Sequence, residues 1–426
     1  MAPGSALREE TLREVETLGA ADIVVGIPSY NNARTIGHVV RAVTSGLAKY
    51  FPECAAVLVN SDGGSADGTP DVVAAAEIGA AKALLLRQPA RPAQRVLTAY
   101  QGIPGKGSAF RAVFEIAERL GARACAVVDS DLRSITPQWV ELLVGPVLHE
   151  GFDYVCPLYA RHKYDGTITN ALVYPLVRAV YGRRIRQPIG GDFGFSGALA
   201  RHFLTHDVWD TEVARFGIDI WMTTTALVGD FRVCQAYLGA KLHDAKDPGA
   251  HLSAMLAEVS GSLFRQLEAH APFWQQIEGS QPVPEFGFHY EVGLEPVAVD
   301  VPRMVNAFRH GMRDFAGLYG TILSPDTLAH CDALTRVDDD EFRMPGDLWV
   351  RLAYEYAVAY HARRPNPAHL LATLTPLYLA RTASWVREAA AYGAPEVEAA
   401  LDALCLRFEA LKPAFLAAWH EGRFRT

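Results

Sequence analysis

The chain has 426 residues, 50% hydrophobic and 21% charged, a composition typical of globular rather than disordered proteins. This length suffices for two or three domains' worth of core. The formal net charge of −8 argues against a nucleic-acid-binding protein, because affinity for a phosphate backbone requires a basic face.

Segments that would direct the chain to a membrane are not evident. The first residues are charged and lack the apolar stretch of a secretory signal, and no apolar run approaches the roughly 18 residues of a membrane-spanning helix. The six cysteines are not spaced as zinc-binding pairs. We therefore expect a cytoplasmic protein without membrane insertion.

The first 250 residues alternate between strand and helix patterns. Residues 1–20 predict an N-terminal helix. We then expect strands at 22–28, 55–60, 82–86, 124–128, 153–159 and 231–236, and helices at 34–50, from 70, at 104–120 and at 169–181 with a kink at Pro175. This alternation predicts an α/β domain at 21–250, with a mostly parallel, doubly wound sheet. Residues 251–426 predict a helical C-terminal domain, with helices at 251–278, 300–318, 346–363, 367–390 and 394–420.

Two carboxylates follow the apolar run at 124–128. Asp129 and Asp131 flank Ser130, at the strand end where open α/β sheets bind their ligands. Carboxylate oxygens suit Mg²⁺ or Mn²⁺, which in turn neutralises a diphosphate. The alternative is a capping turn, since Asp and Ser commonly end strands and begin helices.

Two earlier loops indicate a nucleotide. Pro28-Ser29-Tyr30-Asn31-Asn32 follows the first strand, and Asn60-Ser61-Asp62-Gly63-Gly64-Ser65 follows the second, so both reach the same edge of the sheet. Asp62 can accept hydrogen bonds from a base or ribose, and the glycines allow close backbone approach. Each loop alone is also compatible with an ordinary strand–helix connection.

Taken in order, these motifs resemble the nucleotide-sugar glycosyltransferases of the GT-A fold. Further segments are similar to the group of glucosyl-3-phosphoglycerate, mannosylglycerate and glucosylglycerate synthases. They are Pro104-Gly105-Lys106-Gly107, Leu143-Val144-Gly145-Pro146, Gln187-Pro188-Ile189-Gly190-Gly191-Asp192 and Leu238-Gly239-Ala240-Lys241-Leu242-His243. The resemblance spans roughly residues 22–248, and a helical C-terminal region is also typical of the group.

The resemblance implies a role for each matching residue. Asp131 and His243 would hold the metal, and Lys106 would bind the diphosphate or the sugar at a helix N-terminus. Asp192 and Asp219 would act in catalysis, with Asp192 also touching the acceptor. Donor-binding residues would be Pro28, Ser29, Tyr30, Asn32, Asp62, Lys106, Asp129 and Ser130. Relatives often carry Glu at the position of Asn32, so the base, uridine or guanosine, stays open.

Acceptor choice rests on the segment Asp165-Gly166-Thr167-Ile168-Thr169. Phosphoglycerate-using relatives have arginine where this chain has Thr167, and a guanidinium is the natural bidentate partner of a phosphate. Gly166, Thr167 and Thr169 would bind a carboxylate through N–H and hydroxyl groups. D-glycerate is therefore the expected acceptor, unless the basic residues at 161–163 or 183–186 bind a phosphate.

Together these features predict a retaining, Mg²⁺- or Mn²⁺-dependent transferase that moves a hexose from a nucleoside diphosphate sugar to a small carboxylated acceptor; retention is implied by the family. Partners would be these two substrates and a second copy of the chain in a homodimer. The alternatives are a glucosyl-3-phosphoglycerate synthase, an inverting polysaccharide or polyprenyl-phosphate glycosyltransferase, and a nucleotide-sugar-binding protein without catalysis.

Overall fold

The computed structural model describes residues 5–76, 94–99, 105–242, 253–290 and 292–424. Their contacts group into two compact units that interleave along the chain. The sheet unit comprises residues 1–160, 187–244 and 283–295, and the helical unit comprises residues 161–186, 245–282 and 296–426. Residues 161–186 thus belong with the helices although they lie well before residue 250.

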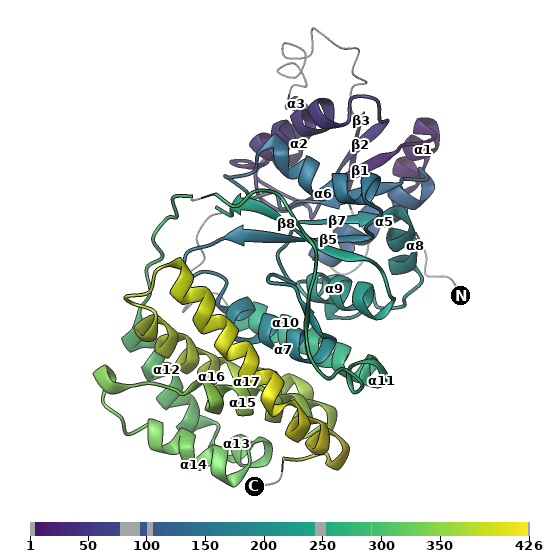
Figure 1. The fold of residues 1–426 in the computed structure, drawn as a ribbon. Coiled ribbons are helices and arrows are strands. Elements are labelled where there is room, and N and C mark those ends of the chain that lie inside the picture. The colour runs from purple at the N-terminus through teal and green to yellow at the C-terminus, as the bar shows by residue number, and fades with distance from the viewer. Residues whose placement is uncertain (1–4, 77–93, 100–104, 243–252, 291, 425–426) are drawn as a thin grey trace. The chain divides into compact units, whose positions relative to one another are not determined.

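An eight-stranded sheet forms the centre of the sheet unit (Figure 1). Its order is β10-β8-β5-β7-β4-β1-β2-β3, and every pairing is parallel except those of β7. The strands are β1 (Ile23–Ser29), β2 (Ala56–Asp62), β3 (Gln94–Ala99), β4 (Ala124–Val127), β5 (Tyr154–Ala160), β7 (Phe193–Ser196), β8 (Val233–Ala240) and β10 (Glu285–Phe286). The carboxyl ends of β1, β2, β4, β5 and β8 therefore meet at one edge.

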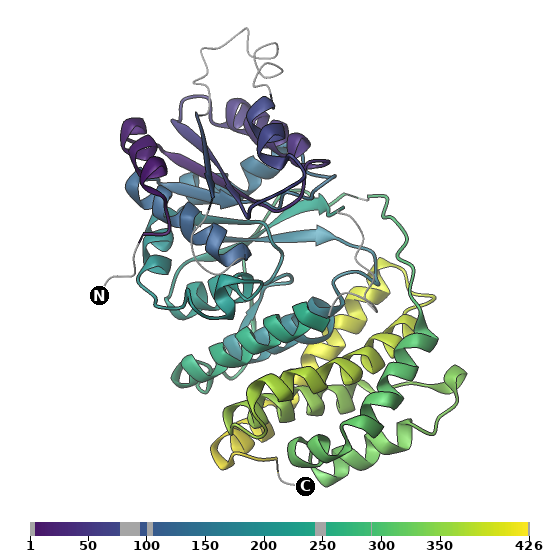
Figure 2. The ribbon, with the colours of Figure 1, turned by 180° about the vertical axis from the view of Figure 1, so that it is seen from behind.

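Helices cover both faces of this sheet (Figures 1 and 2). On one face α2 (Ile36–Tyr50) and α6 (Pro137–His149) bury an apolar core against alternate residues of β1, such as Val25. On the other face α5 (Lys106–Arg119) lies so close to β1 that a Cβ on Gly26 would be 2.5 Å from Val113. The unit also contains α1 (Glu9–Leu18), α3 (Thr69–Ala75), α8 (Gly197–Leu204), η2 (Glu212–Ala214) and α9 (Ile218–Val228).

The helical unit is built around aromatic side chains. A π-helical turn, η1 (Thr169–Val173), leads into α7 (Tyr174–Tyr181), and Pro175 in its first turn accounts for the irregular start. The other elements are β6 (Arg183–Arg184), α10 (Ser253–Ala269), α11 (Ala271–Trp274), β9 (Gln281–Pro282), α12 (Val301–Asp314), α13 (Ala316–Ile322), α14 (Pro325–Leu334), η3 (Asp339–Glu341), α15 (Gly346–His361), α16 (Pro367–Glu388) and α17 (Ala394–Glu421). Trp349, Tyr354 and Tyr378 are buried in its core.

The predicted fold class is confirmed: a mostly parallel α/β sheet is present, and helices dominate the C-terminal region. The strand expected at 82–86 lies outside the described residues, and a strand that we did not expect, β3, occupies 94–99. The long helices expected at 251–278 and 300–318 are each broken in two. Within the described part of the chain, no helix combines the length and the apolar character needed to cross a membrane.

The antiparallel strand β7 was not predicted, because Phe193-Gly194-Phe195-Ser196 has a glycine at its centre and glycine weakens strands. The structure explains this glycine. A Cβ on Gly194 would lie 1.9 Å from the carbonyl oxygen of Leu143 on α6. Helix α6 can therefore pack closely on β7 only where a side chain is missing.

Gly194→Ala should destabilise the sheet unit by about 3 kcal/mol, as overpacking does in a rigid core. The matched control is Gly320→Ala on α13, where an added Cβ meets nothing within 4 Å. That substitution should be neutral or stabilise by up to about 1 kcal/mol, because alanine favours helix over glycine. Urea unfolding of both variants is the measurement, and equal stability of the two would contradict the packing argument.

Candidate active site

Five charged side chains, Lys106, Asp129, Asp192, Asp219 and Lys241, gather at the carboxyl edge of the sheet, and we call them the charge cluster. Asp129 follows β4, Lys241 follows β8, and Asp192 precedes the antiparallel β7, so three strands deliver them to one place. Lys106 and Asp219 lie in the first turns of α5 and α9. A β-bulge opposite Leu158 and Tyr159 interrupts the β5–β8 pairing just before Lys241, and such bulges re-aim side chains.

Lys106 lies on the outer side of the charge cluster. Its Nζ is 2.8 Å from Asp129 Oδ1 and 3.3 Å from Asp219 Oδ1, and it donates a 3.2 Å hydrogen bond to the Gly191 carbonyl. Its side chain is 14% exposed. The start of α5 packs tightly on η2, because a Cβ on Gly107 would lie 1.9 Å from the Val213 carbonyl oxygen. Tight backbone packing thus fixes where Lys106 emerges.

Lys241 lies on the inner side and is 3% exposed. Its Nζ donates three hydrogen bonds of 2.7 Å, to Asp129 Oδ2, to the Gly190 carbonyl and to Asp192 Oδ2. An ammonium has three donors, so these bonds use all of them. Both carboxylate oxygens of Asp129 are therefore bound to a lysine.

Asp192 is 0% exposed. It accepts hydrogen bonds from the hydroxyl of Tyr159 and, at 2.7 Å, from the backbone N–H of Asp129, besides the one from Lys241. A side chain so enclosed cannot contact a substrate unless its turn moves. The role of Asp192 in catalysis and acceptor binding stays a prediction, and its surroundings favour a positioning role.

Burial and charge pairing shift the ionisation of this site in opposite directions. Burial alone would raise the pKa of Asp129, but the two lysines prevail and hold that pKa well below its usual range. Desolvation raises the pKa of Asp192 and of Asp219, where the lysines only partly oppose it. For Lys106 the effect of burial is outweighed by Asp129 and Asp219, which raise its pKa. Lys106 and Asp129 are therefore charged at neutral pH.

The two predicted nucleotide loops are held together by side-chain hydrogen bonds. Asp62 Oδ1 accepts from the hydroxyls of Ser29 and Ser65, and Asp62 Oδ2 accepts from the backbone N–H groups of Gly64 and Ser65. Asn32 Oδ1 accepts from the hydroxyl of Ser130, which links the first loop to the end of β4. These bonds organise the loops, while the side chain of Tyr30 is 63% exposed beside them. Pro28 lies half-buried in β1.

Asp131 is the carboxylate that fits a cation. It is half-buried, and in the described part of the chain its side chain enters no hydrogen bond or ion pair. Hard, unpaired carboxylate oxygens are suitable ligands for Mg²⁺ or Mn²⁺. The second predicted ligand, His243, lies outside the described residues. No group of three His, Cys, Asp or Glu side chains that could hold a metal ion occurs among the residues the structure describes.

The predicted acceptor loop belongs to the helical unit. The backbone N–H of Gly166 donates to Asp165 Oδ1 at 2.7 Å, and the Thr167 hydroxyl shares a hydrogen bond of 2.5 Å with that of Tyr378. Thr167 and Thr169 are both buried. The Gly166 N–H and the Thr167 hydroxyl thus already have partners, and the acceptor assignment stays a prediction.

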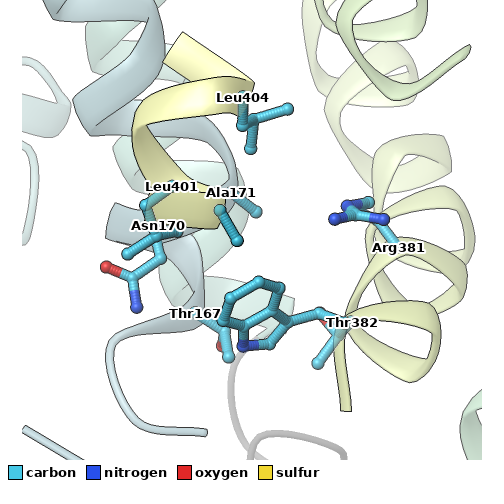
Figure 3. A pocket seen from close by; sticks show the side chains of 9 residues that line it. Thr167, Asn170, Ala171, Arg381, Thr382, Leu401 and Leu404 are labelled. Atoms are coloured by element: carbon cyan, nitrogen blue, oxygen red, sulfur yellow. The ribbon is translucent and has the colours of Figure 1, made fainter. Parts of the chain in front are cut away.

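A pocket in the helical unit borders this loop (Figure 3). Figure 3 shows residues of the 167–171 segment facing side chains of α16 and α17. Its cation, Arg381, is bound at 2.9 Å to both carboxylate oxygens of Glu388 and donates to the Met344 carbonyl. The residues that line the pocket therefore offer no unpaired cation to an anion.

Sequence reasoning overlooked Lys241 and Tyr159. Lys241 lies inside the Leu238–His243 motif, whose resemblance implies a role only for the histidine that ends it. The sequence signal for Lys241 is its position one residue after a buried apolar strand, because a lysine buried there needs a carboxylate partner. Tyr159 gave no comparable signal, since it also fits the alternating pattern of a strand.

Comparison with known proteins gives similar solved structures but no family model and no curated protein that match the chain. One is glucosyl-3-phosphoglycerate synthase from Mycobacterium tuberculosis with Mn²⁺, UDP and glucosyl-3-phosphoglycerate, at 23% identity, 60% coverage of this chain, 83% of that chain and a TM-score of 0.43. The same enzyme with Mn²⁺, UDP-glucose and phosphoglyceric acid is 22% identical, with 63% and 86% coverage and a TM-score of 0.43.

Asp131→Ala should weaken Mn²⁺ binding by at least about tenfold when UDP is present, because it removes a hard ligand from a site with few protein ligands. Calorimetric titration measures this affinity. Asp71→Ala, which removes a carboxylate from the first turn of α3, is the control and should bind Mn²⁺ as the unaltered protein does. Unchanged affinity in Asp131→Ala would remove this residue from the metal site.

Proposed function

We propose that the chain is a metal-dependent, retaining glycosyltransferase of the GT-A type, which transfers a hexose from a nucleoside diphosphate sugar to D-glycerate. The order of the sequence motifs supports the class of enzyme. The proposal is carried by one observation: Lys106, Asp129 and Asp219 meet at the carboxyl edge of the sheet. Asp129 lies two residues before Asp131, the predicted metal ligand.

This arrangement suits the departure of a diphosphate. Lys106 presents an ammonium at the N-terminus of α5, where the helix dipole adds to its attraction for phosphate oxygens. In binding a diphosphate, it would exchange carboxylate oxygens for phosphate oxygens. A bound Mg²⁺ or Mn²⁺ would supply Lewis-acid neutralisation of the leaving group.

Asp219 is the carboxylate best placed to respond to the sugar. Its side chain is 12% exposed, and the raised pKa keeps it a weaker acid than Asp129. As Lys106 turns to the diphosphate, the Asp219 carboxylate loses an ionic partner and gains capacity to accept a hydroxyl proton or to stabilise a cationic sugar. The resemblance to this group of synthases implies that the anomeric configuration is retained.

The surroundings of the acceptor loop support glycerate over phosphoglycerate. Four of the five Arg and Lys side chains at 161–163 and 183–186 already have partners within the helical unit. Arg161 pairs with Asp165 at 3.6 Å, Lys163 donates to the carbonyls of Ala390 and Tyr392, Arg184 donates to Ser280, and Arg186 pairs with Glu398. A phosphate neutralised by any of these four side chains would have to compete with its present partner.

Lys106→Ala should lower kcat about 100-fold, on the order expected when the transition state is deprived of one charge–charge interaction. The rate is measured as hexose transfer in the presence of Mn²⁺. The control is Lys49→Ala, which removes an exposed lysine in the last turn of α2. This variant should retain full activity, because Lys49 is not part of the charge cluster. A Lys106→Ala protein with unchanged kinetics would show that this lysine has only a structural role.

The unaltered protein should use D-glycerate better than 3-phosphoglycerate, by at least about tenfold in kcat/KM, since a poorly compensated phosphate is costly in a closed site. The experiment crosses UDP-glucose, GDP-glucose, ADP-glucose and GDP-mannose with both acceptors. NMR of the product anomer tests retention. Preference for 3-phosphoglycerate would overturn the acceptor assignment and leave the transferase assignment standing.

A further inference from the structure

Lys241 has three partners that belong to different parts of the edge of the sheet. It joins Asp129 at the end of β4 to Gly190 and Asp192 on the turn that leads into β7, each at 2.7 Å. It is also more deeply buried than Lys106, with 3% of its side chain exposed against 14%. One lysine thus lies inside the charge cluster and the other faces outward.

We propose that Lys241 is a positioning residue of the transferase, which holds Asp129 and the turn at 190–192 where Lys106 and Asp219 can act on the donor. This inference rests on the proposed function. Lys241 itself does not touch the sugar nucleotide, because the three N–H groups of its ammonium all donate within the protein.

The turn at 190–192 is built around this lysine. Gly191 has φ of +92°, in a region that favours glycine, and a Cβ there would lie 2.3 Å from Asp129 Oδ2 and 2.9 Å from Lys241 Nζ. The Gly191 carbonyl in turn accepts a hydrogen bond from Lys106. Displacement of the turn would therefore move the ammonium that meets the diphosphate.

The charge balance shows what the loss of Lys241 would do. Three buried or half-buried carboxylates face two ammonium groups, so the charge cluster carries an excess negative charge when all are ionised. If Lys241 is removed, one lysine is left among three carboxylates. The carboxylates of Asp129 and the fully buried Asp192 would then repel each other. Either the turn opens or Lys106 is drawn inward, and both changes misplace the catalytic groups.

Four variants test the proposal: Lys241→Met, Asp192→Asn, their combination, and Lys412→Met. Lys412 is the matched control, because it is a buried lysine of the helical unit that donates to the carbonyls of Trp274 and Ile277. We expect Lys412→Met to change the unfolding temperature but leave kcat unchanged.

Lys241→Met and Asp192→Asn should each lower kcat about 100-fold, the loss expected when catalytic groups are misplaced by about 1 Å. The affinity for UDP with Mn²⁺ and the donor KM should stay within about threefold. The double variant should be no slower than the slower single variant, since both act on one unit. Should Lys241→Met not fold, the double variant, which lacks the unpaired buried charge, should fold and show the same loss.

Three results would overturn the proposal. They are an unchanged kcat in Lys241→Met or the double variant, a UDP affinity that falls in parallel with kcat, and single-variant losses that multiply in the double variant. A protein that transfers no hexose before any substitution would instead refute the proposed function. The positioning role would then be judged from crystals of Lys241→Met, in which the turn at 190–192 should have moved; an unmoved turn contradicts it.

Discussion

The site depends on compensation of the buried Asp129 carboxylate, which lies between the ammonium groups of Lys106 and Lys241. An ion taken out of water is costly unless its partners have good geometry and its remaining hydrogen-bonding capacity is filled. Here each carboxylate oxygen faces one lysine, and the backbone N–H of Asp129 donates to Asp192. Burial of these charged groups therefore fixes the arrangement of the charges and does not in itself stabilise the fold.

Close backbone approach makes this arrangement possible. Gly107 lets the start of α5 lie against η2, Gly191 turns beneath Asp129, and Gly194 lets α6 lie on β7. At each place a Cβ would come within 2.5 Å of another atom. Tight packing and charge pairing thus cooperate, since the lysines reach their carboxylates only because the backbones that carry them are close.

Much of the fold follows from the sequence, because apolar runs such as 124–128 and helical periodicities such as 394–420 are strong local signals. The strand β7 does not, since four residues with a central glycine carry little local preference and are ordered by neighbours on α6, β4 and β5. In the candidate site, Lys106, Asp129 and Asp219 were predicted to be functional, and the structure brings them together. Lys241 and Tyr159 were overlooked because their importance comes from interactions with residues some 30 to 110 positions away in the chain.

We propose that this charge cluster transfers a hexose from a nucleoside diphosphate sugar to D-glycerate. The most direct measurement is NMR of ¹³C-labelled D-glycerate incubated with the protein, Mn²⁺ and each of the four hexose donors. Label should appear in a hexosyl-glycerate with the anomeric configuration of the donor, and excess EDTA should stop its formation. Absence of any labelled glycoside with all four donors, from protein shown to be folded, would contradict it.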